Sequence, residues 1–398
     1  MSFYYATEDE IKRGETTDIY FKRTEQILKA KGLDKVKVVA EVTAGELPEN
    51  WSWAVLTGVE ELVALIKDVP VDVYSIPEGT IFRPRDINGV RIPIAIIEGE
   101  YSQFTSLETP LLGLLCQSSG ISTTAARIRK VAGNKLVISF GIRRMHPMLS
   151  PMIDRSAYIG GVDAVSCVLA ARKMGLEPSG TMPHSLIILF GQQVKAWMAF
   201  DEVVAETIPR VALVDTYFDE KTEAIMAAEA LGKRLWGVRL DTPGSRKGNF
   251  EEIIREVRWE LKLRGYEHVK IITSGGLKEE SISRLSRAGA DGFGVGTRIS
   301  NAPTIDFALD IVEMEGKPVA KRGKYGGRKS VWRCQKCRSD LVSMNKEEND
   351  PKCPKCNSTM KHLLQPLIKN GKIVTELPHP KKIRQHVVEQ LQFYDLVL

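Results

Sequence analysis

From residue 108 onward the chain alternates short apolar runs with segments of helical periodicity, and this alternation limits the fold more than any other feature. The predicted strands cover 135–140, 210–217, 235–240, 269–274 and 291–296. The predicted helices cover 108–132, 156–174, 186–198, a segment ending at 231, 249–264 and 279–287. Apolar runs that alternate with helices are typical of a parallel sheet, and with this many units we favour a closed barrel over an open sheet.

Polar residues follow the ends of the predicted strands. Asp215 ends one run, and Arg239 and Asp241 end the next. The carboxyl ends of the strands form the active site of a parallel α/β barrel, so these side chains should converge at one mouth. The same reasoning adds Arg143, Arg144 and the Ser274-Gly275-Gly276 turn.

His184, in the stretch Gly-Thr-Met-Pro-His-Ser, is the candidate reactive group at this mouth. Imidazole exchanges protons near neutral pH and can act as a nucleophile. A lone histidine is more often structural, and only the surrounding charged strand ends favour catalysis. His146 is the rival, but it precedes Pro147 in a predicted loop, and His268 is expected to face solvent.

Glycines follow the last two predicted strands directly, at Gly275 and Gly276 and again at Gly294 and Gly296. Glycine lets the backbone approach a ligand closely, and free amides at the start of the following helix hold anions. Phosphate sites built by the last loops recur in this fold, so an enzyme for a phosphorylated substrate is favoured over tight turns alone.

The first hundred residues predict a different, α+β domain with a small antiparallel sheet. Helical periodicity in 1–33 precedes a strand at 36–42 and a helix at 50–67, followed by short strands between turns. Near the other end, an Asn-Gly turn predicts a hairpin in 366–377, and 383–394 predicts a final amphipathic helix. We expect the chain to return to the first domain here.

The expected domains are therefore an N-terminal α+β domain over 1–106, completed by about 302–330 and 365–398; a catalytic domain over 107–301; and a small module over 331–364. The last contains Cys334, Cys337, Cys353 and Cys356, two Cys-x-x-Cys pairs at zinc-ribbon spacing. Four thiolates close the coordination shell, so we predict structural Zn²⁺, with iron as the lesser alternative.

Composition and charge limit the expected cellular location and the class of partner. No apolar run is long enough to cross a membrane, and no signal pattern opens the chain, so we expect a cytoplasmic protein without a membrane partner. A net charge of +6 suits anionic substrates as well as nucleic acid. Residues 321–338 contain eight Lys or Arg and no acid, but we do not expect nucleic acid as the partner.

In its order of motifs the chain resembles nicotinate phosphoribosyltransferase, of the type II phosphoribosyltransferase superfamily. The resemblance covers most of residues 10–330. It depends on TDIY (17–20), ETPLL (108–112), TTAAR (123–127), FGIRR (140–144), GGVD (160–163), GTMPHS (180–185), VDTY (214–217), VRLDTPG (238–244), and TSGG with GVG (273–276, 294–296). The cysteine module departs from this pattern.

This resemblance implies an irregular or incomplete parallel, TIM-like α/β barrel, beside an α+β domain made from both ends of the chain and the zinc ribbon. It implies that nicotinate and phosphoribosyl pyrophosphate give nicotinate mononucleotide and pyrophosphate, the first step of NAD salvage from nicotinate. It also implies that ATP is a co-substrate, so that the enzyme is classed as a ligase, and that Mg²⁺ is required. It implies a homodimer with shared active sites, or a higher oligomer.

By motif, the resemblance makes His184 the residue that ATP phosphorylates. Asp215 and Asp241 are expected to hold ribose hydroxyls or Mg²⁺, and Arg239 the departing phosphates. Arg143 or Arg144, with Phe140 as a stacking surface, would bind the nicotinate ring and its carboxylate. Tyr20 would reach the ring from the neighbouring subunit. Asp163 would lie near the ring or the ribose, and Thr181, Ser274 and Thr297 are further expected ligands of the substrates. The loops at Gly275, Gly276, Gly294 and Gly296 would take the 5′-phosphate.

Two alternatives stay open. A related enzyme could use quinolinate, which needs a second cationic pocket and no phosphorylatable histidine, or nicotinamide, which has no charge for paired arginines to meet. In a different class, the chain could be a nucleic-acid-binding zinc protein on an enzyme scaffold, which would bind RNA in a salt-dependent way. The set of charges at the strand ends argues against that second class.

Overall fold

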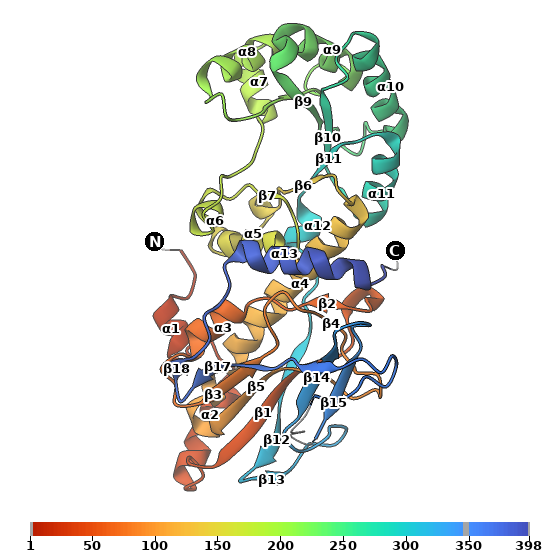
Figure 1. Cartoon of the computed structure of the whole chain (residues 1–398). Helices are drawn as coiled ribbons and strands as arrows, with labels where there is room; N and C mark the ends of the chain where they lie inside the picture. The colour runs from red at the N-terminus through yellow and green to blue at the C-terminus, as the bar shows by residue number, and fades with distance from the viewer. Residues whose placement is uncertain (1–2, 345–349, 397–398) are drawn as a thin grey trace. The chain divides into compact units, whose positions relative to one another are not determined.

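Two sheets of different kinds organise the chain, one antiparallel and one parallel (Figure 1). The computed structural model describes residues 3–344 and 350–396. Residues 1–123 and 303–397 form the first compact unit and residues 124–302 the second. Helix α4, Glu108–Ala132, is continuous across the boundary at 123/124. The three-part domain division stays a prediction.

Both ends of the chain build the antiparallel sheet of the first unit, as predicted. Its strand order is β13-β12-β1-β5-β3-β17-β18. Strand β1 pairs on one side with β5 and on the other with β12, so residues as far apart in the chain as Val38 and Met314 are partners in one sheet. The strands are β1 Lys37–Ala44, β3 Asp72–Ser75, β5 Pro93–Glu100, β12 Phe307–Met314, β13 Lys317–Pro318, β17 Gln365–Lys369 and β18 Lys372–Ile373.

The predicted Asn-Gly hairpin is confirmed in this sheet. Strands β17 and β18 pair antiparallel around Asn370 and Gly371, which have φ of 45° and 75°. Positive φ at both central residues is what a tight two-residue hairpin turn requires.

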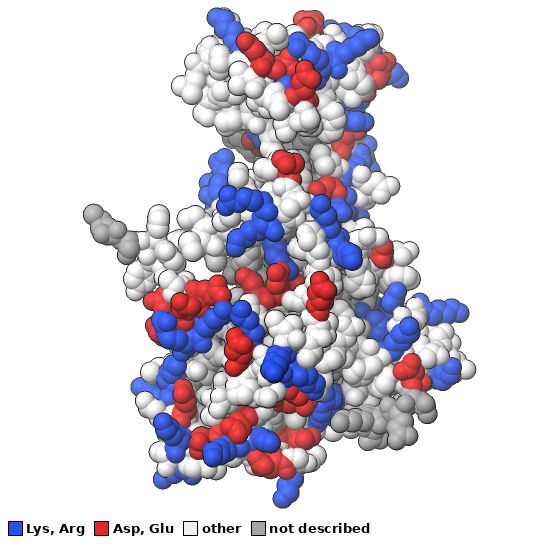
Figure 2. Space-filling model, turned by 60° about the vertical axis from the view of Figure 1, so that its left-hand side comes forward, with Lys and Arg blue, Asp and Glu red and all other residues white. Residues whose placement is uncertain are grey.

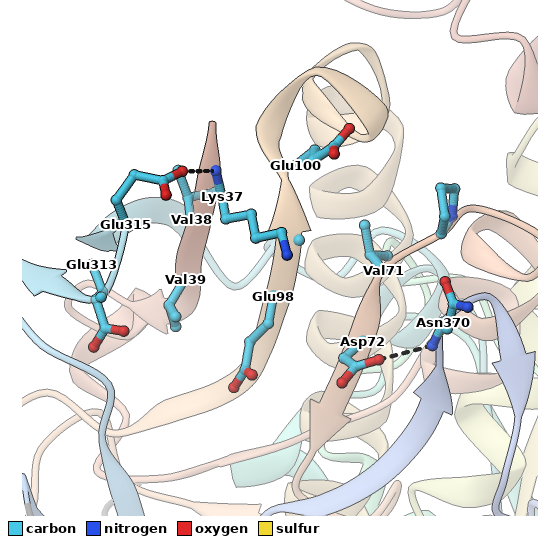
Figure 3. A pocket seen from close by; sticks show the side chains of 13 residues that line it. Lys37, Val38, Val39, Val71, Asp72, Glu98, Glu100, Glu313, Glu315 and Asn370 are labelled. Atoms are coloured by element: carbon cyan, nitrogen blue, oxygen red, sulfur yellow. Dashed lines mark hydrogen bonds between the residues drawn. The ribbon is translucent and has the colours of Figure 1, made fainter. Parts of the chain in front are cut away.

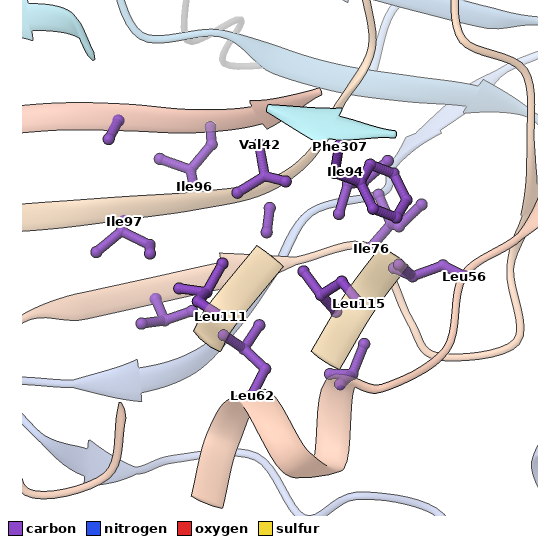
Figure 4. Close-up of a cluster of buried hydrophobic side chains, with 14 of the residues drawn as sticks. Val42, Leu56, Leu62, Ile76, Ile94, Ile96, Ile97, Leu111, Leu115 and Phe307 are labelled. Atoms are coloured by element: carbon purple, nitrogen blue, oxygen red, sulfur yellow. The ribbon is translucent and has the colours of Figure 1, made fainter. Parts of the chain in front are cut away.

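The core of the first unit lies between this sheet and α3 and α4 (Figure 4). Val42 and Ile96 from the sheet meet Leu62 of α3 and Leu111 and Leu115 of α4, all with at most 1% of their surface exposed. The helices of this unit are α1 Glu8–Lys12, α2 Ile19–Ala30, α3 Val59–Ile66, the first part of α4, and α13 Pro380–Gln390.

The helix predicted over 50–67 begins only at Val59. Gly58 before it has φ of 91°, and a Cβ there would lie 2.6 Å from the Leu114 carbonyl oxygen, so the helix cannot continue through it. The preceding residues instead form β2, Ala54–Val55, which pairs with β4, Ile81–Phe82.

The cysteine module forms a three-stranded antiparallel sheet within the first unit. Its strands are β14 Ser330–Cys334, β15 Asp340–Ser343 and β16 Met360–His362, in the order β15-β14-β16. The backbone N–H of Val342 donates to Asp86 at 2.9 Å, and that of Ile87 donates to the Asp340 carbonyl at 3.2 Å. The module is therefore joined to the rest of the first unit by hydrogen bonds.

The second unit contains six parallel strands in the order β7-β6-β11-β10-β9-β8. They are β6 Leu136–Ser139, β7 Ala164–Val165, β8 Arg210–Leu213, β9 Leu235–Leu240, β10 Lys270–Ser274 and β11 Gly292–Val295. In the described part of the chain, β7 and β8 do not pair with each other. The incomplete parallel barrel is thus confirmed, and the preference for a closed one is wrong.

Helices follow most of these strands. They are α5 Ser150–Ile159, α6 Val168–Lys173, α7 His184–Phe190, α8 Gln193–Val203, α9 Glu220–Leu231, α10 Phe250–Leu263, α11 Glu279–Ala288 and α12 Thr297–Ser300. Two predicted helices are wrong as single elements. The one over 156–174 is interrupted near Gly161, with φ of 115°, and by β7, and the one over 186–198 is broken at Gly191, with φ of 70°.

Candidate active site

A pocket of about 520 Å³ lies at the carboxyl ends of the parallel strands of the second unit. The loops after β6, β9, β10 and β11 and the segment before α7 contribute to it. The sequence-predicted residues that line it are Phe140, Arg143, Arg144, Thr181, His184, Arg239, Asp241, Ser274, Gly275, Gly276, Gly294, Gly296 and Thr297. Side chains from across the second unit therefore do meet at one edge of the sheet.

Three of the glycines that line the pocket are required by geometry. Gly275 and Gly276 after β10 have φ of 84° and 69°, a backbone region that other residues avoid. A Cβ on Gly294 would lie 2.4 Å from ring carbons of Phe140. The Phe140 ring can therefore lie directly on the backbone of β11 and form an apolar wall of the pocket.

His184 is the first residue of α7 and is held among polar groups. Its Nδ1 lies 3.1 Å from the Thr216 hydroxyl, and its Nε2 lies 3.8 Å from Asp241 Oδ2 and 3.9 Å from Asp215 Oδ1. Burial lowers the pKa of His184, and the Asp241 charge only partly opposes this. The imidazole is therefore mainly neutral at pH 7, the state in which a ring nitrogen can act as a nucleophile.

Asp215 and Asp241 differ in exposure although they are neighbours. The Asp215 side chain is 3% exposed, and its Oδ1 accepts no hydrogen bond from the described residues. Burial, reinforced by the Asp241 charge, raises the pKa of Asp215 to about 7. Asp241 is more open and accepts a 2.7 Å hydrogen bond from the Ser274 hydroxyl. One carboxyl can thus exchange a proton near pH 7 beside another that faces the pocket.

Three arginines supply positive charge. Arg239 is largely buried, donates to the Met182 carbonyl at 3.2 Å and lies 3.6 Å from Asp241. Its guanidinium carbon is 5.9 Å from the centre of the Phe140 ring. Arg143 and Arg144 form the exposed short turn after β6, at the edge of the pocket. The pocket therefore combines one fixed cation with two exposed ones.

Asp215 and Asp163 are the predicted residues of the second unit that do not line the pocket. Asp215 lies directly behind it, with Oδ2 accepting from the Asp241 backbone N–H at 3.1 Å. Asp163 precedes β7 and so lies at the opposite, amino-terminal edge of the sheet. Its carboxylate binds Arg129 at 2.7 Å and the Val137 N–H at 2.8 Å. This position favours a structural role over the predicted contact with ring or ribose.

Tyr20 belongs to the first unit, where it lies exposed on α2 with its hydroxyl 3.4 Å from Asp18. Its predicted role at a neighbouring subunit's site stays a prediction. The rival His146 is exposed, and its Nδ1 accepts from the Met148 N–H at 3.3 Å, capping a short turn. His268 is exposed, as expected. Arg127, on α4, is buried with its Nε 3.5 Å from Glu279.

Sequence reasoning missed three polar residues that support the pocket. Thr216 directly follows a strand-end aspartate and could have been found by the same rule that selected Asp215. Lys247 donates to the Ser274 carbonyl at 3.3 Å and to the Gly275 carbonyl, but nothing in the Pro-Gly-Ser-Arg-Lys-Gly loop predicts that contact. Glu223 lies inside α9, where a glutamate is normally read as a surface residue.

The four predicted zinc ligands come together in the ribbon. Their Sγ atoms all lie within 4.8 Å of one another, and three of the Sγ–Sγ distances are 3.4 to 3.6 Å. A tetrahedron of thiolates at the usual Zn–S distance has edges of about 3.8 Å, close to this spacing. The backbone N–H of Cys337 points to Cys334 Sγ at 3.4 Å, which suits a charged thiolate. The group therefore fits a structural metal ion.

A second hollow of about 560 Å³ lies on the first unit and is lined by several acids (Figure 3). Glu315 accepts from the Lys37 N–H at 2.6 Å, Asp72 accepts from the Asn370 N–H at 2.8 Å, and Glu98 pairs with Arg328. Because these carboxylates bind the protein's own donors, this hollow is a weaker candidate than the first pocket.

The basic stretch 321–338 is largely engaged by acids of the first unit. Lys321 and Lys324 pair with Asp310, and the buried Lys329 pairs with Glu41 at 2.7 Å. On the face drawn in Figure 2, basic and acidic side chains are intermixed. The stretch therefore offers fewer free cations than its composition suggests. Within the described residues, no helix is long and apolar enough to cross a membrane.

Two family models match consecutive parts of the chain. The model described as "Quinolinate phosphoribosyl transferase, N-terminal domain" matches residues 18–119, and the corresponding C-terminal domain model matches 121–310. Nicotinate phosphoribosyltransferase pncB2 of Mycobacterium tuberculosis is 33% identical over 333 residues, which are 79% of this chain and 65% of the relative. The enzyme of that name from Bacillus subtilis is 26% identical over 364 residues, 80% and 72% of the two chains. The chain thus spans about 65% of the mycobacterial relative's length.

Solved structures match more of the chain. A crystal structure described as nicotinate-nucleotide pyrophosphorylase from Pyrococcus furiosus is 55% identical, with a TM-score of 0.95 and full coverage of both chains. Human nicotinic acid phosphoribosyltransferase has a TM-score of 0.73 at 20% identity, covering 95% of this chain and 94% of that one. At that identity the human protein supports the fold alone.

Proposed function

This chain belongs to the nicotinate phosphoribosyltransferase family, within the type II phosphoribosyltransferases, and we propose that it joins nicotinate to phosphoribosyl pyrophosphate. The products are nicotinate mononucleotide and pyrophosphate. The observation that carries this proposal is the pocket of the second unit, where glycine loops, a fixed arginine and two carboxyl groups surround one histidine.

The glycine loops and Arg239 suit the anionic substrate. Backbone N–H groups around Gly275, Gly276, Gly294 and Gly296 would bind the 5′-phosphate, since no side chains block them there. Arg239, held by Met182 and Asp241, would face the departing pyrophosphate. Binding is thereby placed on rigid groups whose positions need not change during the reaction.

The Phe140 ring, Arg143 and Arg144 suit the pyridine base. Phe140 offers a flat apolar surface, and the exposed turn Ile142–Arg144 offers guanidinium groups for the ring carboxylate. In the reaction, the ring nitrogen forms a bond to the anomeric carbon of ribose. The bond from that carbon to the pyrophosphate oxygen breaks, and its electron pair leaves with pyrophosphate.

Asp241, with Asp215 behind it, would stabilise the positive charge that develops on the sugar. Asp241 lines the pocket and would accept a hydrogen bond from a ribose hydroxyl, while Asp215, buried behind it, would act through its charge. The same two carboxyl groups and the substrate phosphates would hold Mg²⁺, since carboxylate and phosphate oxygens are its usual ligands. When bound, Mg²⁺ would neutralise charge on the departing phosphates.

His184 would accept the terminal phosphoryl group of ATP. A ring nitrogen forms a bond to phosphorus, the bond from phosphorus to the bridging oxygen breaks, and ADP leaves with the electron pair. Two features support this role: the lowered pKa of His184 and its place on the pocket wall. Hydrolysis of the phosphohistidine would then couple ATP use to turnover.

Quinolinate is the alternative base. It is favoured by the description of the two matching family models. It would need a second cationic group for its additional carboxylate, and among the residues lining the pocket Arg143, Arg144 and Arg239 provide the cations. If Arg239 binds pyrophosphate, Arg143 and Arg144 must bind both carboxylates of quinolinate. We therefore rank nicotinate first.

The deciding experiment measures mononucleotide formation from phosphoribosyl pyrophosphate with nicotinate, quinolinate or nicotinamide, each with and without ATP. The parent, His184→Ala and the matched control His146→Ala are compared. We expect ATP-stimulated turnover of nicotinate, loss of the stimulation in His184→Ala, and parent-like behaviour in His146→Ala. Turnover of quinolinate alone would transfer the proposal to that base, and no turnover with any base would refute it.

Three further features are proposed with this function. Zn²⁺ bound by the four cysteines would stabilise the ribbon without taking part in the reaction. The active unit would be a homodimer to which Tyr20 contributes from the neighbouring subunit. Binding of nucleic acid, which the basic stretch raised as an alternative, is disfavoured by the ion pairs of that stretch.

A further inference from the structure

A single buried carboxylate holds the loop that follows β8. Glu223 is fully buried, and its side chain accepts four hydrogen bonds. The backbone N–H groups of Thr216, Tyr217 and Phe218 donate to it at 3.1, 2.7 and 2.9 Å. The Gln193 side-chain amide donates at 2.8 Å. Because every donor is neutral and precisely directed, the loop has one well-defined conformation as long as the carboxylate is present.

The 216–218 loop contacts the His184 ring at Nδ1. Thr216, whose N–H binds Glu223, places its hydroxyl 3.1 Å from His184 Nδ1. On the other side of the ring, Nε2 lies near Asp215 and Asp241. The Thr216 hydroxyl can donate to Nδ1 or accept from it, so this contact holds the ring in either neutral tautomer, including the one in which Nε2 keeps its lone pair. Thr216 thus determines the orientation of the ring and keeps Nε2 turned towards Asp215 and Asp241.

Glu223 also accepts a hydrogen bond from α8, the helix that follows the helix of His184. His184 begins α7, which is followed after two residues by α8, and Gln193 is the first residue of α8. Gln193 is 4% exposed and donates its amide to Glu223. The segment that carries the histidine and the loop that orients it therefore meet at the same carboxylate.

We propose that Glu223 is a positioning residue for His184, acting through Thr216. The carboxylate fixes the 216–218 loop, and the loop fixes the imidazole in the geometry needed for phosphoryl transfer from ATP. This inference rests on the proposed role of His184. A purely structural role would instead make Glu223 important for folding and equally important with or without a histidine at 184.

The test uses the full-length protein and measures the ratio of mononucleotide formation with ATP to that without ATP. We compare Glu223→Gln, Thr216→Val and Thr216→Ser, each also combined with His184→Ala. Glu223→Gln is nearly isosteric but turns an amide towards N–H donors, and Thr216→Val removes only the hydroxyl. We expect the ATP stimulation ratio to fall by about tenfold or more in both and to stay within about threefold of the parent in Thr216→Ser.

Residues that act through one group give non-additive losses, so Glu223→Gln combined with His184→Ala should be no slower than His184→Ala. A further loss equal to that of Glu223→Gln alone would overturn the proposal. If Glu223→Gln does not fold, Thr216→Val carries the same comparison.

A second readout separates failure of this inference from failure of the proposed function. In protein labelled with ¹⁵N-histidine, the ring-nitrogen shifts of His184, assigned from His184→Ala, report the hydrogen bonding of the ring without any substrate. We expect the Nδ1 shift to change in both Thr216→Val and Glu223→Gln, because the hydroxyl that contacts Nδ1 is removed or displaced. Unchanged ring-nitrogen shifts in both variants would refute the positioning role even if the enzyme uses ATP. Changed shifts in a protein that ATP does not stimulate would refute only the ATP coupling.

Discussion

Replacing Asp215 by Asn should stabilise the protein in a way that depends on pH. Asp215 is 3% exposed, lies near Asp241 and has a pKa raised from 3.8 to about 7. In the unfolded chain the same group ionises near its ordinary value. Between these two values the folded state binds more protons, so the parent loses stability as pH rises through the folded pKa. Asparagine has nearly the same shape and avoids this loss.

The expected size follows from the pKa shift. From pH 5 to just above pH 7 the parent crosses about two pH units of this window, at about 1.4 kcal/mol for each unit. Solvent in the pocket beside Asp241 screens part of the charge, so we expect a relative gain of about 2 kcal/mol for Asp215→Asn at pH 8. For a unit of this size that gain corresponds to a Tm difference of about 4–8 °C between pH 5 and pH 8.

The assay is differential scanning calorimetry of parent and variant at several pH values, with the same zinc content. The difference in Tm at each pH cancels the titration of every group that the two proteins share. Asp163→Asn is the matched control, since its carboxylate is paired with Arg129 at the other edge of the sheet. It should be destabilised and show no gain at high pH. A difference for Asp215→Asn that stays constant from pH 5 to pH 8 would refute the reasoning.

Three further predictions follow from the geometry. Gly294→Ala should destabilise the second unit by about 1–3 kcal/mol in chemical denaturation and abolish turnover, because its Cβ would overlap the Phe140 ring; parent-like turnover would show that the ring moves freely. Chelation of zinc should unfold the ribbon, seen as hydrogen exchange in 330–343 and 350–362, while the second unit keeps its protection; cooperative loss of both units would contradict this. Arg143→Ala with Arg144→Ala should raise the KM for nicotinate at least tenfold and change that for phosphoribosyl pyrophosphate little, as measured by steady-state kinetics.

The site was more predictable than the fold around it. Strand ends of a parallel sheet lie at one edge, so Arg239, Asp241 and Ser274 could be grouped from their positions after apolar runs alone. The same rule could not identify residues that lie at the amino-terminal edge of the sheet, away from the pocket. Asp163 looked similar in sequence but precedes its strand, and there its carboxylate pairs with Arg129. Hydrophobic periodicity cannot locate a strand of only two residues such as β7, so it cannot show whether a charged residue precedes or follows that strand.

The three helices whose predicted bounds were wrong share a physical cause. Gly58, Gly161 and Gly191 adopt positive φ, and each ends or divides a segment whose apolar spacing fits a helix. Apolar spacing reports which residues are buried, whereas the backbone break depends on close contacts such as that of Gly58 with Leu114. Barrel closure was misjudged for a related reason. Counting strands cannot reveal that β7 and β8 remain edges in the described chain, because closure depends on the pairing between strands.

The shifted pKa values of two groups at the pocket would help it to hold the highly anionic substrate that we propose without first binding counter-ions. Burial lowers the pKa of His184 and raises that of Asp215, so each is drawn towards its neutral form near pH 7. A charged Asp215 would repel the substrate phosphates that we propose for Arg239 and the glycine loops. With Asp215 protonated, Asp241 is balanced by Arg239, and Arg143 and Arg144 leave the rim positive. Bound Mg²⁺, or positive charge developing on the sugar of the proposed substrate, would lower the pKa of Asp215 and favour its ionised form. The negative charge would then arise only after the cation that it stabilises is present.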